Sequence, residues 1–213
     1  MTRAAWFLTI AAMIALAVSG PGTRMGWWHF RTGLLLFAAS GLIAVLAAIV
    51  SLVAWIRHRA SHQPRFSSII ATLLSVAVAA FVGSTVVSAR GKPAIHDIST
   101  DLGEVPETAA QQRAAYGDIQ PIEIAMPPQE AFRRVQKAAG DLGWKITSSR
   151  PEEGVLQASD TTAFFGFTDD VIVRVRAAGG GSRVDVRSTS RVGKSDVGQN
   201  AKRIRSFREK LRG

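Results

Sequence analysis

Cysteine is absent from all 213 positions of the sequence. Its absence excludes disulfide bonds, cysteine-ligated zinc, thiol catalysis and a lipid-modified N-terminal cysteine, but it leaves the compartment open. The sequence also lacks a P-loop, a dinucleotide-binding fingerprint, a nucleophile elbow and a zinc-protease helix. We therefore expect no cofactor, no metal site and no catalytic residue, and we favour a non-enzymatic protein over an enzyme.

Acidic residues are absent from the first 95 positions, which hold eight Lys or Arg. All sixteen Asp and Glu lie in residues 96–213 with the other eighteen basic residues, so this part is nearly neutral. The net charge of +10 therefore comes mostly from the acid-free part. Nucleic-acid binding would need basic residues clustered with stacking aromatics on a soluble surface, and we expect no nucleic-acid partner.

Three apolar stretches in residues 1–93 are predicted to cross a membrane as helices. Residues 32–56 and 69–89 carry no charge over 25 and 21 positions, and about 20 apolar residues span the hydrocarbon layer. Residues 4–19 are shorter, so they form either a thin first span or the core of a cleaved signal peptide. We favour the span, because a second apolar stretch follows closely. Tryptophans at the predicted ends support these boundaries: Trp6, Trp27, Trp28 and Trp55.

Small residues recur every four positions in the second and third stretches, a pattern that lets helices approach closely in lipid. They form either a packing seam or a by-product of alanine-rich composition, and we favour the seam. Neither stretch contains a charged residue, which disfavours a transporter or a pump. The small residues are Ser40, Ala44 and Ala48, then Ala71, Ser75, Ala79 and Gly83.

The loop between these two stretches predicts the orientation of the chain. It carries Arg57, Arg59 and Arg65, and the positive-inside rule places such a loop in the cytoplasm. Residues 94–213 are then expected on the far side, in the periplasm if the membrane is a bacterial inner membrane. Four basic residues on that side oppose the assignment: Arg24, Arg31, Arg90 and Lys92.

Residues 94–213 predict a small α+β domain that follows the helices. Gly and Pro recur in residues 94–118 without an apolar period, which favours an extended linker. In residues 119–213 the order β-α-β-β-β-β-β-α favours a mainly antiparallel sheet covered on one face by two helices. The expected strands are 119–125, 144–149, 155–159, 163–168, 170–177 and 182–190, and the expected helices are 128–143 and 196–211 with Ser195 or Asp196 as the second N-cap.

The last two strands can be placed in register. A turn centred on Gly179 and Gly180 makes them a hairpin, and the alternation on each side fixes which residues face the core. Arg174 then lies opposite Asp185 as a cross-strand pair of opposite charge. The other predicted pairs are Val175 with Val184, Val173 with Val186, Val171 with Ser188, Asp170 with Thr189 and Asp169 with Ser190.

The segment that follows this hairpin has the parts of an anion-binding site. It runs off a strand at Arg187, turns at Gly193 and enters a helix N-terminus near Asp196. Arginines, hydroxyls and free backbone N–H groups at a helix start bind anions. Alternatively, the two aspartates consume these donors in a structural network. The candidate ligand-binding residues are Arg187, Ser188, Ser190, Arg191, Asp196, Asn200, Arg203, Asp169 and Asp170.

Asp169 and Asp170 have an alternative role as acid or base of an unrecognised enzyme. Adjacent residues of a strand point to opposite faces, which argues against joint action on one atom. His96 and Asp97, with Asp101 nearby, offer metal ligands, but no second histidine lies close to them in sequence. We expect them instead to dock the linker on the domain by hydrogen bonds.

Aromatic and basic side chains elsewhere in this part have simpler explanations. The aromatic residues Trp144, Phe164, Phe165 and Phe167 are expected in the core, and the alternative is an apolar pocket that takes a lipid acyl chain. The outer face of the last helix is expected to be solvated, although basic residues also strengthen contact with an anionic membrane. Its basic residues are Lys202, Arg203, Arg205, Arg208, Lys210 and Arg212.

Three segments together resemble the domain of unknown function numbered 1499. They are residues 95–101, residues 164–170 with their paired Asp, and residues 187–200 followed by Arg203. The resemblance covers residues 94–211 and includes all nine candidate binding residues. It implies a bacterial envelope or chloroplast protein, in some members with hydrophobic segments before the domain. The family has no established activity, so the resemblance implies no catalytic role.

These observations predict a membrane-anchored envelope module that binds an anionic or lipidic partner through the region 187–203. The expected partners are the lipid bilayer and either an anionic lipid or another envelope protein. Two alternatives remain open. One is an unrecognised enzyme for an envelope substrate that uses Asp169 or Asp170, and the other is a scaffold or assembly factor that uses the small-residue stripes.

Overall fold

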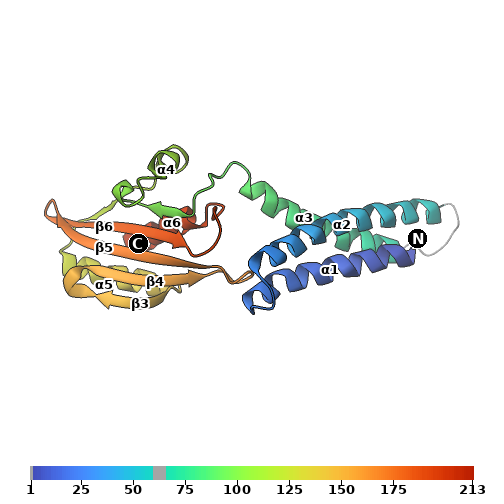
Figure 1. Cartoon of the computed structure of the whole chain (residues 1–213), viewed down its shortest axis with the longest axis horizontal. Coiled ribbons are helices and arrows are strands. Elements are labelled where there is room, and N and C mark those ends of the chain that lie inside the picture. Colours follow the sequence, from blue (N-terminus) through green and yellow to red (C-terminus); the bar gives the residue numbers. More distant parts are fainter. Residues whose placement is uncertain (1, 60–65) are drawn as a thin grey trace. The chain divides into compact units, whose positions relative to one another are not determined.

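The computed structural model describes residues 2–59 and 66–213, and the chain divides into two compact units. The helical unit comprises Met1–Arg90 with the hairpin tip Ala163–Gly166. The sheet domain comprises Gly91–Thr162 and Phe167–Gly213. Figure 1 colours both units along the sequence.

The helical unit contains three helices that are long and apolar enough to cross a membrane, which indicates an integral membrane protein. They are α1 (Thr2–Arg24), α2 (Phe30–Arg59) and α3 (Phe66–Ala89). The first helix is longer than expected because it continues past Pro21, and proline is tolerated in membrane-spanning helices. Part of the loop that predicts the orientation, residues 60–65, lies outside the described residues.

Small side chains pack the three helices together. Ser40, Ala44 and Ser75 are fully buried, and the hydroxyls of Thr9 and Ser75 lie 2.9 Å apart in a hydrogen bond between α1 and α3. A side chain at Gly41 would clash with Val82 across the α2–α3 contact. The predicted seam is therefore confirmed for its buried members, although Ala48 and Ala79 are only partly buried and Gly83 is exposed.

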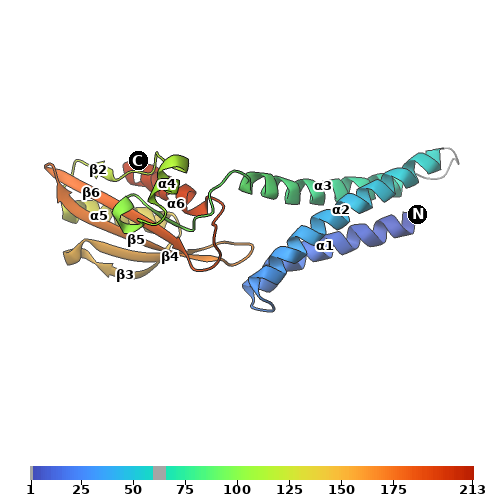
Figure 2. The same cartoon turned by 45° about the horizontal axis from the view of Figure 1, so that its top comes forward.

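The sheet domain has an antiparallel six-stranded sheet and three α-helices, so the α+β prediction is confirmed. The strands lie in the order β1-β6-β5-β4-β3, and β2 also pairs with β6. Helices α5 and α6 contribute buried apolar residues to one face of the sheet, and Figure 2 shows the helices beside the strands. The strands are β1 (Asp97–Ser99), β2 (Ile122–Ile124), β3 (Lys145–Arg150), β4 (Val155–Thr161), β5 (Thr168–Ala178) and β6 (Gly181–Ser190). The helices are α4 (Ala109–Ala115), α5 (Pro128–Asp141) and α6 (Gln199–Arg212), with short 3₁₀ turns at Leu102–Glu104 and Pro151–Glu153.

The core lies between these two helices and the sheet. The Trp144 ring stacks on Phe207 with centroids 5.1 Å apart, and both side chains are buried. Removing a buried aromatic side chain of this size typically costs about 3–5 kcal/mol of stability. The inward residues of the central strands complete this core: Leu156, Val171, Val173, Val175, Val184 and Val186.

The predicted register of the β5–β6 hairpin is confirmed at every pair. Gly179 and Gly180 have φ of 54° and 84°, as a two-residue hairpin turn of this type requires. The expected ion pair between Arg174 and Asp185 is wrong, however. Arg174 bonds Glu104 instead, and Asp185 accepts from Arg183, whose Nε lies 3.0 Å away. Glu104 lies in the segment that was expected to be a linker. The alternation of residues within the hairpin could therefore not predict Glu104 as the partner of Arg174.

Residues 94–118 are not an extended linker. β1 pairs with β6, and Ile95, Ile98 and Tyr116 are buried in the core of the sheet domain. A three-residue strand and isolated apolar residues produce no period, which is why the sequence pattern missed them. The expected strand 163–168 is also wrong, because it forms a tight connection in which the Thr162 N–H donates to the Phe167 carbonyl at 2.8 Å. The sheet still has six strands, because β1, which was not expected, replaces the expected strand 163–168.

Candidate functional site

Eight of the nine candidate residues form two groups on opposite faces of the sheet, because neighbouring residues of a strand point to opposite faces. Asp169, Ser188 and Ser190 face the helices, where Asn200 and Arg203 of α6 meet them. Asp170 and Arg187 point to the other face, which follows from the hairpin register, and Arg191, directly after β6, bonds Asp170 there. Asp196 lies in the loop before α6. The structure therefore does not assemble all nine into one site.

Arg203 is the centre of the helix-facing group. Its side chain is only 6% exposed, and its Nη2 lies 2.7 Å from a carboxylate oxygen of Asp169, itself buried. Its Nε donates to Asp160 at 2.8 Å, and its Nη1 donates to Ser188 and Asn200. The guanidinium is thus surrounded by acceptors, as a buried charge requires. Asp160 was not a candidate from sequence, because it lies 43 positions away from Arg203.

Asn200 and Asp196 join the start of α6 to residues 95 and 96, which come shortly after α3 in the chain. Asn200 Nδ2 donates to the His96 carbonyl at 2.9 Å and to Ser190 Oγ at 3.0 Å. The Asp196 carboxylate accepts from the backbone N–H of Gly198 and of Asn200 at 2.8 and 2.7 Å. The prediction of Ser195 or Asp196 as the N-cap residue is therefore wrong, because Gly198 occupies this position, although the Asp196 carboxylate still accepts from the N–H of Asn200 in the first turn of α6.

The outward-facing group consists of two separate ion pairs. Arg187 donates from Nε and Nη2 to the two oxygens of Asp97 at 3.0 and 2.6 Å, and this contact raises the pKa of Arg187. Arg191 makes the same two-point contact with Asp170 at 2.9 and 2.7 Å. The Arg191 hydrogen bond lowers the pKa of Asp170, because it stabilises the ionised form of that carboxyl.

The arginine donors of the predicted anion site are already bonded to carboxylates within the sheet domain. Each of Arg187, Arg191 and Arg203 bonds a carboxylate of the sheet domain, so the region 187–203 matches the structural network that was the alternative. The network was expected to use Asp169 and Asp170 alone. Asp97 and Asp160 also accept from these arginines. Such pairs are best explained as ties between the hairpin, α6 and β1.

The same geometry disfavours the acid/base alternative. Asp169 is buried against Arg203, and Asp170 lies on the other face of the sheet with Arg191. His96, Asp97 and Asp101 also do not meet as ligands, because Asp97 bonds Arg187 while Asp101 accepts from the Gly103 N–H at 3.0 Å. Within residues 2–59 and 66–213 no group of three metal-binding side chains comes together.

Of the four aromatic candidates, only Trp144 lies in the main core. Phe164 and Phe165 belong to the hairpin tip of the helical unit, where their rings make an edge contact at 5.0 Å. Phe167 is partly buried. Short aromatic runs therefore predicted the core poorly here, because three of the four fall in a connection between strands.

Several basic side chains on the outer face of α6 are bonded to acidic residues or backbone carbonyls of the sheet domain. Arg205 donates to both carboxylate oxygens of Asp118 at 2.7 Å, and Arg208 donates to the Asp118 carbonyl. The contact with Arg205 lowers the pKa of Asp118. Lys210 lies 3.4 Å from Asp141. Lys202 and Arg212 have no such ion-pair partner among the described residues.

A groove of about 890 Å³ lies between α5 and α6. Met126, Ala138 and Leu142 give it an apolar part, and a smaller pocket of about 200 Å³ shares Leu142 and Ser206 with it. Asp160 and Arg203 line that smaller pocket. The groove depends on how two helices pack, so no local sequence pattern could indicate it. Its charged lining residues are Arg133, Arg134, Lys137, Lys210, Glu130, Asp141 and Glu209.

Comparisons with known proteins give a family and little else. The family model described as "Protein of unknown function (DUF1499)" matches residues 97–211, and no curated protein matches the chain. Among solved structures, TTHA0849 from Thermus thermophilus is 10% identical over 43% of this chain and 93% of its own, with a TM-score of 0.27. Ara h 8.0201 is 16% identical over 43% of this chain and 94% of its own, with a TM-score of 0.24. At such TM-scores neither likeness supports an argument about fold or function.

Proposed function

This chain belongs to the DUF1499 family of proteins of unknown function, and we propose that it is a membrane-anchored module that binds phospholipid. In this proposal α1, α2 and α3 hold the sheet domain at a membrane, and the groove between α5 and α6 takes the lipid. The observation that carries the proposal is the combination of apolar side chains with charged side chains from both helices in the lining of this groove.

The size and lining of the groove suit one amphiphilic molecule. Ligand sites usually have volumes of about 300–1,000 Å³, and the groove has about 890 Å³, with three apolar and seven charged lining residues. The apolar side chains Met126, Ala138 and Leu142 would contact an acyl chain. This division of the lining into apolar and charged parts favours a lipid over a fully polar ligand.

The charged lining suits a head group that contains a phosphate. Arg133 and Arg134 have no ion-pair partner among the described residues, and guanidinium groups bind phosphate well. Lys137 and Lys210 both approach Asp141, so this trio keeps one positive charge. Glu130 and Glu209 also line the groove, and they could accept from the ammonium group of a zwitterionic phospholipid.

The region 187–203, which contains the last of the three family-like segments, has a structural role in this proposal. Asn200, Asp196 and Ser190 hold the backbone of Ile95 and His96, and Arg187 holds Asp97. Together these contacts fix the first residues after the third helix against β6 and α6. We therefore assign these residues a bracing role where the chain enters the sheet domain, and we assign lipid binding to the groove.

The proposal keeps the predicted orientation, with the sheet domain on the side opposite the cytoplasm. The support is the basic loop that carries Arg57, Arg59 and Arg65. In a bacterial inner membrane the sheet domain would then be periplasmic. A reporter enzyme that is active only outside the cytoplasm, fused after Gly213, should be active, and a cytoplasmic reporter at the same position should be inactive. The opposite pattern would reverse the orientation.

Native mass spectrometry of the full chain in detergent tests the groove directly. Phospholipid is added to delipidated protein, and the apparent Kd is compared between the wild type and the double variant Arg133→Gln/Arg134→Gln. Loss of two charged contacts should weaken binding at least about tenfold, since each such contact contributes about 1.5–3 kcal/mol.

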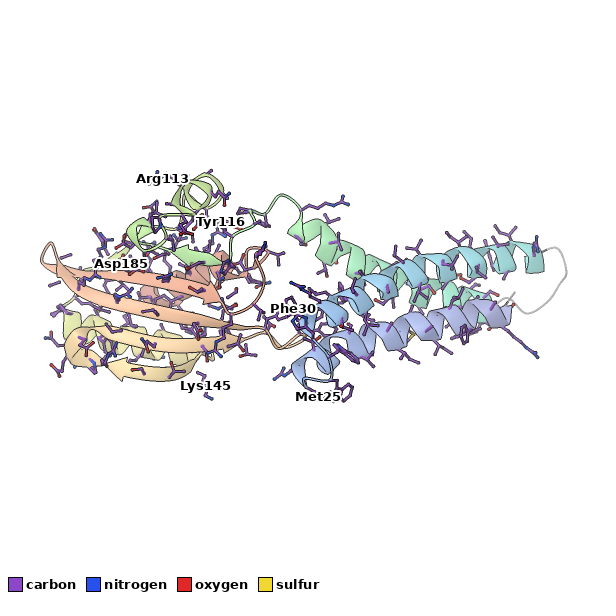
Figure 3. The ribbon with its side chains drawn as sticks, viewed as in Figure 1. Met25, Phe30, Arg113, Tyr116, Lys145 and Asp185 are labelled. Carbon is purple, nitrogen blue, oxygen red and sulfur yellow. The ribbon has the colours of Figure 1, made fainter. Side chains whose placement is uncertain are left out.

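A matched control removes two basic residues elsewhere in the sheet domain. Arg113 of α4 and Lys145 of β3 are exposed, and both are labelled in Figure 3. The double variant Arg113→Gln/Lys145→Gln has the same net charge as the groove variant and should bind phospholipid as the wild type does. Equal affinities for all three proteins would contradict binding in the groove.

A further inference from the structure

The loop between β6 and α6, residues 191–198, exposes two apolar side chains. Val192 is 41% exposed and Val197 is 47% exposed. In the described part of the sheet domain, Ile146 at 40% is the other large apolar residue with this degree of exposure. Lys194 lies between the two valines, is exposed and has no ion-pair partner among the described residues. The loop therefore presents two apolar groups with a cation between them.

Internal contacts hold this loop in place. Asp196 is buried and bonds Gly198 and Asn200, and the Asp196 N–H donates to the Ile95 carbonyl at 3.2 Å. Val197 has a φ of 48°, which is a costly conformation for a β-branched residue. An unfavourable backbone that keeps an apolar side chain in water points to a role for that side chain outside the domain.

The loop is bonded to the segment that follows α3 in the chain. Ser195 Oγ donates to the Pro93 carbonyl at 3.3 Å, and Pro93 follows Ala89, the end of α3, by only four residues. Four residues of extended chain reach at most about 14 Å. The side chain of Lys92 also lies beside Gly198. The loop with its two valines and Lys194 is thus attached to the chain only a few residues after α3, beside Lys92.

We propose that this loop contacts the bilayer surface, with Val192 and Val197 in the interfacial layer and Lys92 and Lys194 beside anionic head groups. Apolar side chains gain free energy when they leave water, and basic residues near an anionic lipid surface are attracted to it. The contact is a second membrane attachment, separate from the three helices, and it does not depend on lipid in the α5–α6 groove.

Site-directed fluorescence tests the contact, and the absence of cysteine makes labelling specific. Single-cysteine variants Val192→Cys, Val197→Cys and Ile146→Cys of the full chain are labelled with an environment-sensitive dye. They are then reconstituted in vesicles of phosphatidylcholine and phosphatidylglycerol that also contain lipids with a nitroxide quencher. Labels at positions 192 and 197 should emit at shorter wavelength and be quenched severalfold more than the label at position 146.

The charge requirement is tested in the same vesicles. Lys194→Glu in the Val192→Cys protein should reduce lipid quenching at least twofold, and vesicles of phosphatidylcholine alone should have a similar effect on the unaltered loop. Water-like emission at positions 192 and 197 without quenching would overturn the proposal. A blue shift without lipid quenching would also overturn it, because a second copy of the chain or another protein would then cover the loop.

Discussion

Arg187 and Asp97 lie on neighbouring antiparallel strands, 90 positions apart in sequence, and join through two hydrogen bonds of 3.0 and 2.6 Å. Thr189 adds a third bond to the same carboxylate at 2.7 Å. Asp97 is the first residue of β1 and follows the last membrane helix closely. The pair therefore links the first strand of the sheet domain to β6 at the start of the region 187–203.

Replacing Arg187 should loosen this junction. Arg187→Gln removes two charge-assisted bonds from a half-buried pair, and we expect a loss of about 1–3 kcal/mol in the free energy of unfolding of the sheet domain. Hydrogen exchange of the full chain in detergent measures it, and amides of β1 should exchange faster than those of β4. The control is Arg191→Gln, which breaks an equally regular but more exposed pair that does not involve β1 and should leave the exchange of β1 amides nearly unchanged. Equal protection of β1 in both variants would contradict the bracing role.

Replacing Arg203 should have a larger effect. Arg203→Leu leaves Asp169 buried without its partner, and such isolated charges cost about 3–5 kcal/mol. Urea unfolding of the sheet domain, followed by pulse proteolysis, should show the loss. The double variant Arg203→Leu/Asp169→Leu should recover part of it, because no unpaired buried carboxylate remains at that position. No recovery would mean that Arg203 acts mainly through Ser188 and Asn200.

Acid should weaken the sheet domain through Asp170 and Asp118. Hydrogen bonds from Arg191 and Arg205 lower the pKa of these carboxyls from the ordinary value of 3.8. A lowered pKa in the folded state stabilises the protein above the unfolded value, and this stability is lost as the pH falls through the folded pKa. Unfolding free energy should therefore decline below about pH 4. Asp118→Asn/Asp170→Asn should show a shallower decline, and an unchanged decline would show that other carboxyls cause it.

Val197 offers a test in which stability and membrane contact change in opposite directions. Asn tolerates positive φ better than Val does, so Val197→Asn should stabilise the sheet domain in detergent by about 1 kcal/mol. The same change should lower lipid quenching of a dye at position 192. Val192→Asn is the control, since it also removes an exposed valine but has no positive φ to relieve. A less stable Val197→Asn protein would show that the valine packs within the domain.

Local patterns in the sequence predicted the hairpin and the membrane helices well. The β5–β6 register followed from alternating valines and the turn at Gly179 and Gly180, and both signals lie within 22 positions of the chain. The apolar helices were evident because length and the lack of charge are local properties. The α+β class followed from the order of these elements.

Contacts between distant segments were not predictable in the same way. Nothing near Arg203 in sequence indicates Asp160, and nothing near Arg187 indicates Asp97. β1 is too short to show alternation, so its segment resembled a linker. The α5–α6 groove depends on the packing of two helices, and their apolar stripes predict burial but no crossing geometry. The sequence therefore indicated residues that the fold joins by hydrogen bonds and ion pairs, while their partners could only be identified from the structure.

Photo-crosslinking in native membranes tests the central proposal of phospholipid binding most directly. Membranes that contain the full chain are loaded with a phospholipid that carries a photoreactive group in its acyl chain, and labelled peptides are identified by mass spectrometry. The proposal predicts labelling of peptides that contain Ala138 and Leu142, reduced in the Arg133→Gln/Arg134→Gln variant. Labelling confined to α1, α2 and α3, with none in α5 or α6, would contradict it.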